Sequence, residues 1–377
     1  MRIGIEAQRL FRKEKHGMDY VVLNELRQLQ CIDSENEYYV FVKPGEDRCL
    51  ESSTNMHIIE LNCPTYIIWE QWALPRAVRK WNVDLLHCTS NTAPLRCSVS
   101  ILLTLHDVIF MEGSTHSASL YQKFGNIYRR IIVPRVTKKC TKIITVSNYE
   151  INNIVSNLQI PRERIIVLHN GYDSIFRPLN DDNFVYKKYI DQVGYFFILG
   201  NTDSRKNIER MLIAYSDYLK QSIFKRKLVI TSLNEAYINE LLEKNDIVSI
   251  KDQIVLTGYI PIEDLPYLYN DAFVFLFASL REGFGIPIIE SMACGTPVIT
   301  SDTSSMPEVA GENAILVNPE QPNEITAMML RLERDDTFYR YQQEYGLRHA
   351  TAFSWKETME RLLTIYNEVY AEAFSIS

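Results

Sequence analysis

Short apolar runs alternate with helix-length segments along this chain, and no other feature restricts its possible folds as strongly. Such alternation is typical of parallel α/β architecture, because each strand returns through a crossover helix. The pattern occurs twice, and 377 residues are enough for two domains. We therefore predict an α/β protein with two doubly wound parallel sheets. The strands are expected near residues 3–5, 38–42, 56–61, 84–87, 100–105, 142–146 and 165–168, and then near 195–199, 227–231, 254–257, 272–277, 297–300 and 314–317.

A polar, turn-rich segment separates the two sets of strands. It runs from Arg177 to Lys188 and suits an exposed connection between domains. We place the N-terminal domain at 1–178, the linker at 179–190 and the C-terminal domain at 191–355. An apolar stripe at helical spacing runs from Trp355 to Tyr370. It predicts a helix over 356–377 that packs back on the N-terminal domain.

Composition and charge exclude several classes of protein. The longest nearly apolar stretch, Ala272–Leu280, is far shorter than the roughly 20 residues of a membrane-spanning helix. The N-terminus shows no secretion signal. The seven cysteines are scattered, without the paired spacing of a zinc site. The net charge of −7, with only the N-terminal half slightly basic, argues against nucleic-acid binding. We expect a cytoplasmic protein that binds neither nucleic acid nor metal.

The polar residues that follow the predicted strands are the candidates for chemistry, because ligands of open parallel sheets bind outside the carboxyl ends of the strands. His106 and Asn170 follow strands of the first sheet. The segment from Gly200 to Lys206, then Tyr259 and Glu282, follow strands of the second. We expect the two rims to face each other across a deep cleft, so that one substrate bridges both domains.

The stretch from Leu280 to Pro297 is the most informative part of the chain. A buried strand ends there, Gly283 and Gly285 let a ligand approach the backbone closely, and the following helix has a proline in its first turn. The first N–H groups of such a helix suit a phosphate. Glu290 lies among apolar neighbours, so its carboxylate needs partners, and a vicinal diol such as ribose supplies two hydroxyl donors. The alternative is a structural glutamate held by backbone N–H groups.

Three more side chains have two possible interpretations each. Arg205 and Lys206 begin a helix, where adjacent cations can grip a diphosphate and stabilise a departing nucleoside diphosphate. The alternative is a solvated surface pair. His106 could hold a sugar hydroxyl or transfer a proton, or it could be structural.

Residues 121–142 form a basic stretch, with no acidic residue between Glu112 and Glu150. Its cations alternate with large apolar side chains, which predicts an amphipathic surface that contacts anionic lipid head groups at the inner face of a membrane. The alternative is a solvated face of a core helix. Pro134 is expected to interrupt that helix.

The motifs of several other enzyme classes are missing, including G-x-G-x-x-G, G-x-x-x-x-G-K-[ST], G-x-S-x-G and a D-x-D at a strand end. Instead, the stretch Glu282-Gly-Phe-Gly-Ile-Pro-Ile-Ile-Glu290 resembles the motif of two glutamates separated by seven residues in family-4 retaining glycosyltransferases of the GT-B fold. The resemblance covers nearly the whole chain and is strongest to the mannosyltransferase-like branch that builds O-antigen and capsule chains. Further matching segments are Val146-Ser147, His169-Asn170-Gly171-Tyr172-Asp173, Arg205-Lys206-Asn207, Ser304 to Gly311 and Phe353-Ser-Trp355.

The resemblance implies a role for each matching residue. Glu290 would bind the nucleotide ribose, Arg205 with Lys206 the diphosphate, and His106 the sugar near its anomeric centre. Glu282 would hold the donor sugar together with the Phe284-Gly285 backbone. The other donor-binding residues would be Gly17, Asn170, Gly200, Tyr259, Gly283 and Ile286. The family transfers the sugar with retention, using the leaving phosphate to help deprotonate the acceptor, with no enzyme nucleophile and no metal.

The first loop departs from the family pattern. The family commonly has Thr-Gly-Ile-Gly-Arg-Tyr, whereas this chain has Lys15-His16-Gly17-Met18-Asp19-Tyr20. Asp19 therefore stands where the second glycine is expected. We expect this change to affect phosphate contact by the loop and to reshape the acceptor site.

The sequence thus predicts a metal-independent retaining glycosyltransferase. It would move a hexose, with mannose favoured by the resemblance, from a nucleotide diphosphate sugar to a glycan or lipid-linked glycan of a surface polysaccharide. Two alternatives stay open. A nucleotide-sugar 2-epimerase would share the fold but need no acceptor, and a catalytically silent subunit would bind a partner transferase. The identity of the nucleobase, sugar, acceptor and linkage is not encoded in any motif.

Overall fold

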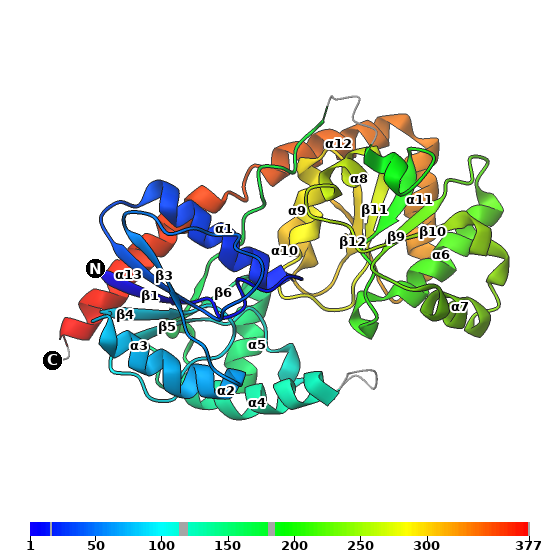
Figure 1. Ribbon diagram of the computed structural model, residues 1–377. Coiled ribbons are helices and arrows are strands. Elements are labelled where there is room, and N and C mark those ends of the chain that lie inside the picture. The colour runs from blue at the N-terminus through cyan, green and yellow to red at the C-terminus, as the bar shows by residue number, and fades with distance from the viewer. Residues whose placement is uncertain (16, 113–119, 180–184, 376–377) are drawn as a thin grey trace. The chain divides into compact units, whose positions relative to one another are not determined.

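The computed structural model describes residues 1–15, 17–112, 120–179 and 185–375 (Figure 1). These residues form two compact units, of which unit 1 runs to Gly171 and resumes at Ser354, and unit 2 covers Tyr172–Phe353. The division lies earlier than the expected boundary at residue 178, because the segment after Gly171 already packs on unit 2, where the Phe176 and Tyr269 rings lie 5.9 Å apart. Residues 180–184 of the expected linker, His16 and residues 376–377 lie outside the described part.

Unit 1 is built on a seven-stranded sheet in the order β3-β2-β1-β4-β5-β6-β7. Every neighbouring pair is parallel. The strands are β1 (Arg2–Glu6), β2 (Glu37–Val42), β3 (Met56–Glu60), β4 (Leu85–Cys88), β5 (Ser100–Thr104), β6 (Lys142–Thr145) and β7 (Ile165–Val167). The strand order reverses between β1 and β4, and the carboxyl ends of these two strands mark the point where open sheets bind ligands.

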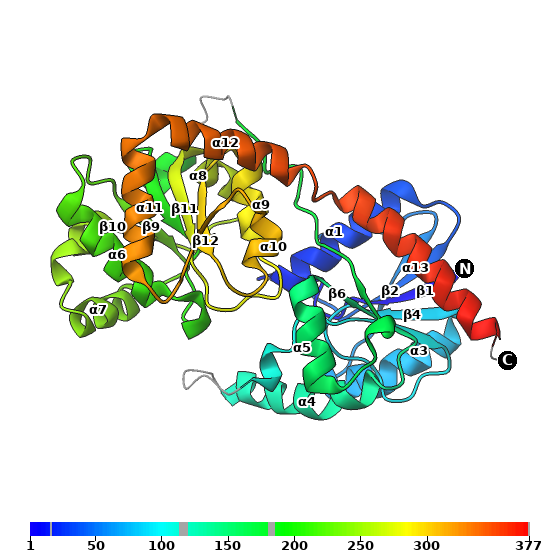
Figure 2. The same ribbon diagram turned by 180° about the vertical axis from the view of Figure 1, so that it is seen from behind.

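Helices cover both faces of this sheet (Figures 1 and 2). On one face lie α2 (Tyr66–Ile68), the π-helical turn η1 (Trp69–Ala73), α3 (Leu74–Lys80), α4 (Leu120–Val136) and α5 (Asn148–Leu158). Apolar side chains of the last four share one core with the strands. On the other lie α1 (Gly17–Ile32) and α13 (Trp355–Ser375), which pack against each other. Short 3-10 turns are η2 (Ile109–Met111) and η3 (Arg162–Arg164).

The apolar stripe of α13 explains why the last helix belongs to unit 1. Met359, Leu362 and Tyr366 are fully buried and face α1, β4 and β5. The ring of His87 on β4 lies between two hydroxyls, with Tyr366 Oη 2.8 Å from Nδ1 and Thr104 Oγ1 2.8 Å from Nε2. Burial lowers the pKa of His87 to about 3, so this contact is made by a neutral imidazole.

Unit 2 is a six-stranded sheet in the order β10-β9-β8-β11-β12-β13, again with parallel pairs only. Its strands are β8 (Tyr195–Ile198), β9 (Leu228–Thr231), β10 (Ile254–Gly258), β11 (Ala272–Phe277), β12 (Val298–Ser301) and β13 (Ile315–Val317). The order reverses between β8 and β11, so this sheet repeats the topology of the first.

One face of the second sheet carries α6 (Ile208–Gln221), α7 (Glu235–Lys244) and α11 (Pro322–Arg334) around a shared core. The other face carries α8 (Leu265–Asp271), α9 (Ile286–Ala293), α10 (Met306–Ala310) and, against α9, α12 (Asp336–Ala350) (Figure 1). The short turns are η4 (Val185–Lys188), η5 (Ser204–Lys206) and η6 (Val248–Gln253). The predicted fold class of two doubly wound parallel sheets is confirmed.

The expectation that Pro134 interrupts the basic helix is wrong, because α4 continues to Val136. Pro134 lies in the last turn. A proline cannot donate one backbone hydrogen bond. In the last turn this loss destabilises the helix little, because few helical residues follow it.

Candidate functional site

The loop between β11 and α9 carries Glu282 and is fastened by two serines that follow β12. Ser304 Oγ donates to the Glu282 carbonyl at 2.8 Å and accepts from its backbone N–H at 3.1 Å. Ser305 Oγ lies 3.0 Å from the same carbonyl and 2.7 Å from the Phe284 carbonyl. The backbone on both sides of Gly283 is thus held before any ligand contacts it. Gly285, with φ of +116°, then turns the chain into α9, whose first residue is Ile286.

Lys206 and Glu282 form an ion pair that joins the carboxyl ends of β8 and β11. Lys206 Nζ lies 2.7 Å from Glu282 Oε1, and both side chains are mostly buried. Asn207 fixes the backbone next to Lys206. It has φ of +59°, and its amide nitrogen donates to the carbonyls of Ala278 at 2.8 Å and Pro319 at 2.7 Å. The pair therefore has a defined place at the switch point of the second sheet.

Arg205 is held by a carboxylate that the sequence reasoning did not single out. Its Nη2 lies 2.6 Å and its Nε 3.2 Å from Asp203 Oδ2. Burial opposes the charge of Asp203, but hydrogen bonds from Arg205 outweigh burial and lower the pKa of that carboxyl. The backbone carbonyl of Arg205 accepts from the N–H of Leu280 at 2.7 Å, which brings this loop against the strand-end segment before Glu282. Both predicted cations thus lie beside the glutamate loop, each with a carboxylate partner.

Glu290 lies one turn inside α9 in mostly apolar surroundings. Its pKa is raised to about 8, mainly by burial and also by the negative charge of Asp173, while a hydrogen bond of 3.3 Å from Tyr269 Oη to Oε2 acts in the opposite direction. Tyr269 belongs to α8, and no signal in the sequence connected it with Glu290. Hydroxyl groups that donate to this carboxyl would stabilise its ionised form and so offset the cost of its burial.

His106 follows β5 in unit 1 and is buried. Its Nε2 lies 2.9 Å from the Thr89 carbonyl, and its backbone N–H donates to Asn91 Oδ1 at 2.7 Å. A carbonyl only accepts, so Nε2 carries the proton and Nδ1 keeps its lone pair. Burial also lowers the pKa of His106, and the ring is neutral at pH 7. In this state Nδ1 can accept a hydrogen bond from a hydroxyl or take up a proton.

Two glycines, Gly171 of the matching segment 169–173 and the predicted site residue Gly200, are required by packing. A side chain at Gly171 would collide with the backbone nitrogen of Trp355, where α13 begins. A side chain at Gly200 would collide with the Thr231 carbonyl at the end of β9. Asn170, next to Gly171, is buried in unit 1, whereas Tyr259 stands exposed after β10.

The first loop of unit 1, where the sequence departs from the family pattern, leads into α1. Gly17 begins α1, and a side chain there would meet nothing within 4 Å. Asp19 lies in the first turn of α1, buried, with Arg12 Nη1 3.4 Å from its Oδ2. A carboxylate in the first turn supplies the negative charge that the helix end favours. This anion belongs to the chain itself, so the first turn of α1 is less suited to a phosphate.

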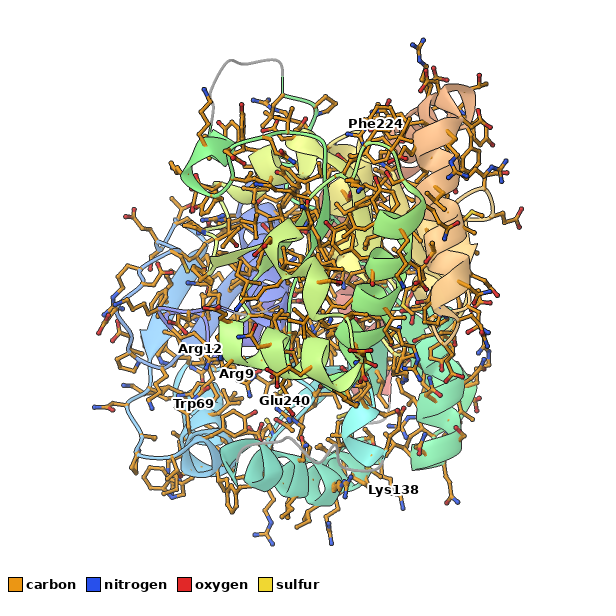
Figure 3. The ribbon with its side chains drawn as sticks, turned by 90° about the vertical axis from the view of Figure 1, so that its right-hand side faces the viewer. Arg9, Arg12, Trp69, Lys138, Phe224 and Glu240 are labelled. Atoms are coloured by element: carbon orange, nitrogen blue, oxygen red, sulfur yellow. The ribbon has the colours of Figure 1, made fainter. Side chains whose placement is uncertain are left out.

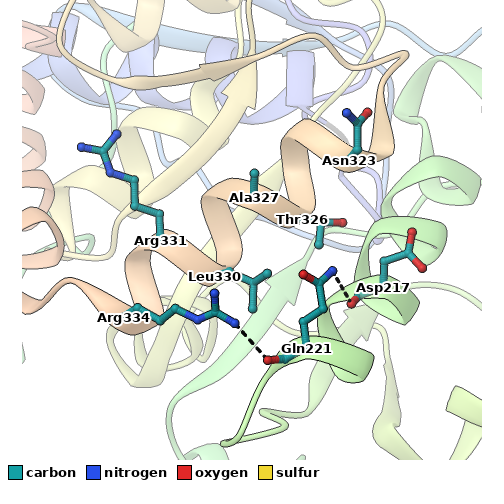
Figure 4. A pocket seen from close by; sticks show the side chains of 8 residues that line it. All are labelled: Asp217, Gln221, Asn323, Thr326, Ala327, Leu330, Arg331 and Arg334. Atoms are coloured by element: carbon teal, nitrogen blue, oxygen red, sulfur yellow. Dashed lines mark hydrogen bonds between the residues drawn. The ribbon is translucent and has the colours of Figure 1, made fainter.

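A pocket of unit 2 contains none of these residues. It lies between α6 and α11 and is lined by Asp217, Gln221, Asn323, Thr326, Ala327, Leu330, Arg331 and Arg334 (Figure 4). Arg334 Nη2 donates to the Gln221 carbonyl at 3.0 Å across it. In the described part of the chain, no group of three or more His, Cys, Asp or Glu could hold a metal ion. The described helices also include none long and apolar enough to cross a membrane.

Comparisons with known proteins place the chain in a class. A family model described as Glycosyltransferase Family 4 matches residues 32–175, and one described as Glycosyl transferases group 1 matches residues 184–349. The chain belongs to these glycosyltransferases. Among solved structures, sucrose-phosphate synthase from Thermosynechococcus elongatus has a TM-score of 0.75 at 18% identity, covering 98% of this chain and 99% of that one. WaaG, a glycosyltransferase involved in lipopolysaccharide biosynthesis, has a TM-score of 0.70 at 14% identity, covering 96% and 99%.

Two curated relatives are mannosyltransferases. The O-antigen chain mannosyltransferase B of Escherichia coli is 31% identical over 59% of this chain and 60% of its own length. The O-antigen chain mannosyltransferase RfbU of Salmonella typhimurium is 27% identical over 71% of this chain and 70% of its own. The match thus spans less than two thirds of the Escherichia coli relative.

Proposed function

We propose that the protein is a retaining hexosyltransferase. It would transfer a hexosyl group, mannose by likeness to its relatives, from a nucleotide diphosphate sugar to a glycan or lipid-linked glycan of a surface polysaccharide, in the cytoplasm. The observation that carries this proposal is the fastened glutamate loop of unit 2. At the carboxyl ends of β8 and β11, this loop brings together the Lys206–Glu282 pair, Arg205 and the start of α9. Two cations and the positive end of the α9 dipole suit a diphosphate, and the carboxylates suit hydroxyl groups.

The proposed roles follow from the charges and donors of each group. Arg205 and Lys206 would stabilise the negative charge that grows on the leaving diphosphate as the bond from the anomeric carbon to its oxygen breaks. Glu282 would accept hydrogen bonds from sugar hydroxyls, and the neutral His106 would accept one through Nδ1. The acceptor oxygen would form the new bond to the anomeric carbon, and its proton would pass to the leaving phosphate oxygen. This scheme requires neither an enzyme nucleophile nor a metal.

Nucleotide binding by the purified protein tests the donor class. We expect UDP, GDP, dTDP or CMP at millimolar concentration to raise the melting temperature by several degrees, since a ligand at 100 times its Kd adds about 2.7 kcal/mol. Stabilisation by one nucleotide alone would identify the donor, with GDP expected for a mannosyl donor. No stabilisation by any of the four would contradict the proposal and favour a silent subunit. Conversion of the nucleotide sugar without an acceptor would instead favour an epimerase.

Proton release on nucleotide binding tests the role of Glu290. At pH 7 this carboxyl, with a pKa of about 8, is mostly protonated in the free protein. Two ribose hydroxyls would favour its ionised form, so binding should release close to one proton. Calorimetric titrations in two buffers of different ionisation enthalpy measure that number. Glu290→Gln should bind the nucleotide more weakly and release no proton, while equal proton release by the variant would remove Glu290 from the site.

A further inference from the structure

Two neighbouring helical segments of unit 1 expose large apolar side chains. Ile68 and Trp72 on α2 and η1 are 42% and 55% exposed. On α4, Phe124, Ile127 and Ile131 are 61%, 54% and 48% exposed. We call these five residues the two-helix surface. Single exposed apolar residues need no explanation, but a group of them indicates a surface that contacts something.

The two segments are in direct contact, so their exposed residues are neighbours. Gln71 Nε2 donates to Tyr128 Oη at 2.9 Å, and the Tyr66 and Tyr128 rings meet edge to face at 5.9 Å. Tyr128 follows Ile127 directly, and Gln71 precedes Trp72. On α4, positions 124, 127 and 131 have the spacing of one helix face. Figure 1 shows α2 and α4 along the same side of the first sheet.

Cations accompany the two-helix surface on its helices, and α3 and α4 contain no acidic residue. Six cations are exposed: Arg76, Arg79 and Lys80 on α3, Arg135 in the last turn of α4, and Lys138 and Lys139 in the turn that follows it. Within the described residues none of these six forms an ion pair with a carboxylate. The acidic residue of segment 66–80, Glu70, is fully buried and accepts hydrogen bonds from Tyr66 and Gln71. The guanidinium of Arg76 lies 3.6 Å from the centre of the Trp72 ring, which places charge and apolar area at one point.

We propose that the two-helix surface docks on an anionic bilayer, with the five apolar side chains among the lipid head groups and the six cations at the level of their phosphates. Apolar residues with an aromatic anchor, mixed with cations and lacking exposed acids, are the pattern of helices that lie on such membranes. The proposal extends the contact predicted for 121–142 to a second segment, whose Ile68 and Trp72 the sequence did not single out. It rests on the proposed function only in that a lipid-linked acceptor would be met at this membrane.

Vesicle binding by the full chain tests the proposal. The probe is a set of vesicles of phosphatidylcholine alone or with about one third phosphatidylglycerol. We expect the protein to co-sediment with the anionic vesicles at least about tenfold more strongly, and salt to weaken this binding. The double variant Trp72→Ser/Phe124→Ser should lose most of the binding. Phe224→Ser is the matched control, because Phe224 of unit 2 is 60% exposed and lies outside the two-helix surface (Figure 3).

Each other outcome overturns the proposal. Wild-type protein that ignores anionic vesicles, a double variant that binds them as wild type does, or a Phe224 variant that loses the same binding would each do so. A dimer of the wild type that the double variant cannot form would assign the surface to a second copy instead. Nucleotide stabilisation of the double variant shows that it is folded. Vesicle binding tests the membrane proposal, whereas nucleotide stabilisation tests the proposed function. Because the two are measured separately, failure of one proposal is distinguishable from failure of the other.

Discussion

Glu282→Gln should reduce kcat/KM for sugar transfer about 10²- to 10³-fold, while nucleotide binding stays within about threefold of wild type. The carboxylate is positioned in advance, because Ser304 and Ser305 hold its backbone and Lys206 Nζ lies 2.7 Å from Oε1. A group that is already in place costs no reorganisation when charge develops, so removing its charge is costly in the transition state. Gln keeps the shape of the side chain and takes away only the charge.

The matched control is Glu240→Gln. Glu240 is an exposed glutamate on α7 of the same unit (Figure 3), far in sequence from the glutamate loop. Glu240→Gln changes the net charge of the protein by the same amount as Glu282→Gln, and it should leave kcat/KM unchanged. Initial rates with a nucleotide sugar and a glycan acceptor, at several donor concentrations, separate kcat from KM. Wild-type turnover by Glu282→Gln would show that the loop does not hold the transferred sugar.

The strands could be predicted from the sequence because each is a short, nearly continuous apolar run, as expected for strands buried on both faces. The helix α12 could not. Its buried positions are Gln342, Gly346 and Ala350, and it packs on α9 through Gly346, next to Met292. Small and polar contacts of this kind leave no apolar period in the sequence, so a search for amphipathic helices passes over them.

The sequence indicates the candidate site side chains more readily than it indicates their partners. Glu282, Lys206 and Glu290 stand out through glycine context and local charge. Their partners Ser304 and Tyr269 come from other loops and helices, and only the fold brings these together. His106 shows the same limit. Its residue type does not say which ring nitrogen carries the proton, and the hydrogen bond of Nε2 to the Thr89 carbonyl, a contact made by the fold, places the proton on Nε2.

Gly171→Ala should lower the free energy of unfolding of unit 1 by about 3 kcal/mol. The added Cβ would lie 2.7 Å from Trp355 Cγ and closer still to the Trp355 backbone nitrogen. The end of a flexible side chain can avoid such a clash by changing its rotamer, but backbone atoms cannot. The loop after β7 and the start of α13 must therefore move apart. That movement weakens the packing of Met359 and Tyr366, which bury α13 against the sheet.

Gly17→Ala is the control, since a Cβ there meets nothing within 4 Å, and we expect a change within about 0.5 kcal/mol. The four tryptophans of the chain, Trp69, Trp72, Trp81 and Trp355, all belong to unit 1. Their fluorescence during urea unfolding therefore follows this unit separately from unit 2, which avoids treating a two-unit chain as one transition. Equal unfolding midpoints for the two variants would mean that the close approach of Gly171 and Trp355 does not hold α13 in place. A lower midpoint for Gly171→Ala alone would identify the glycine of the His169-Asn170-Gly171 segment as a packing requirement of the fold, separate from any contact that Asn170 makes with the donor.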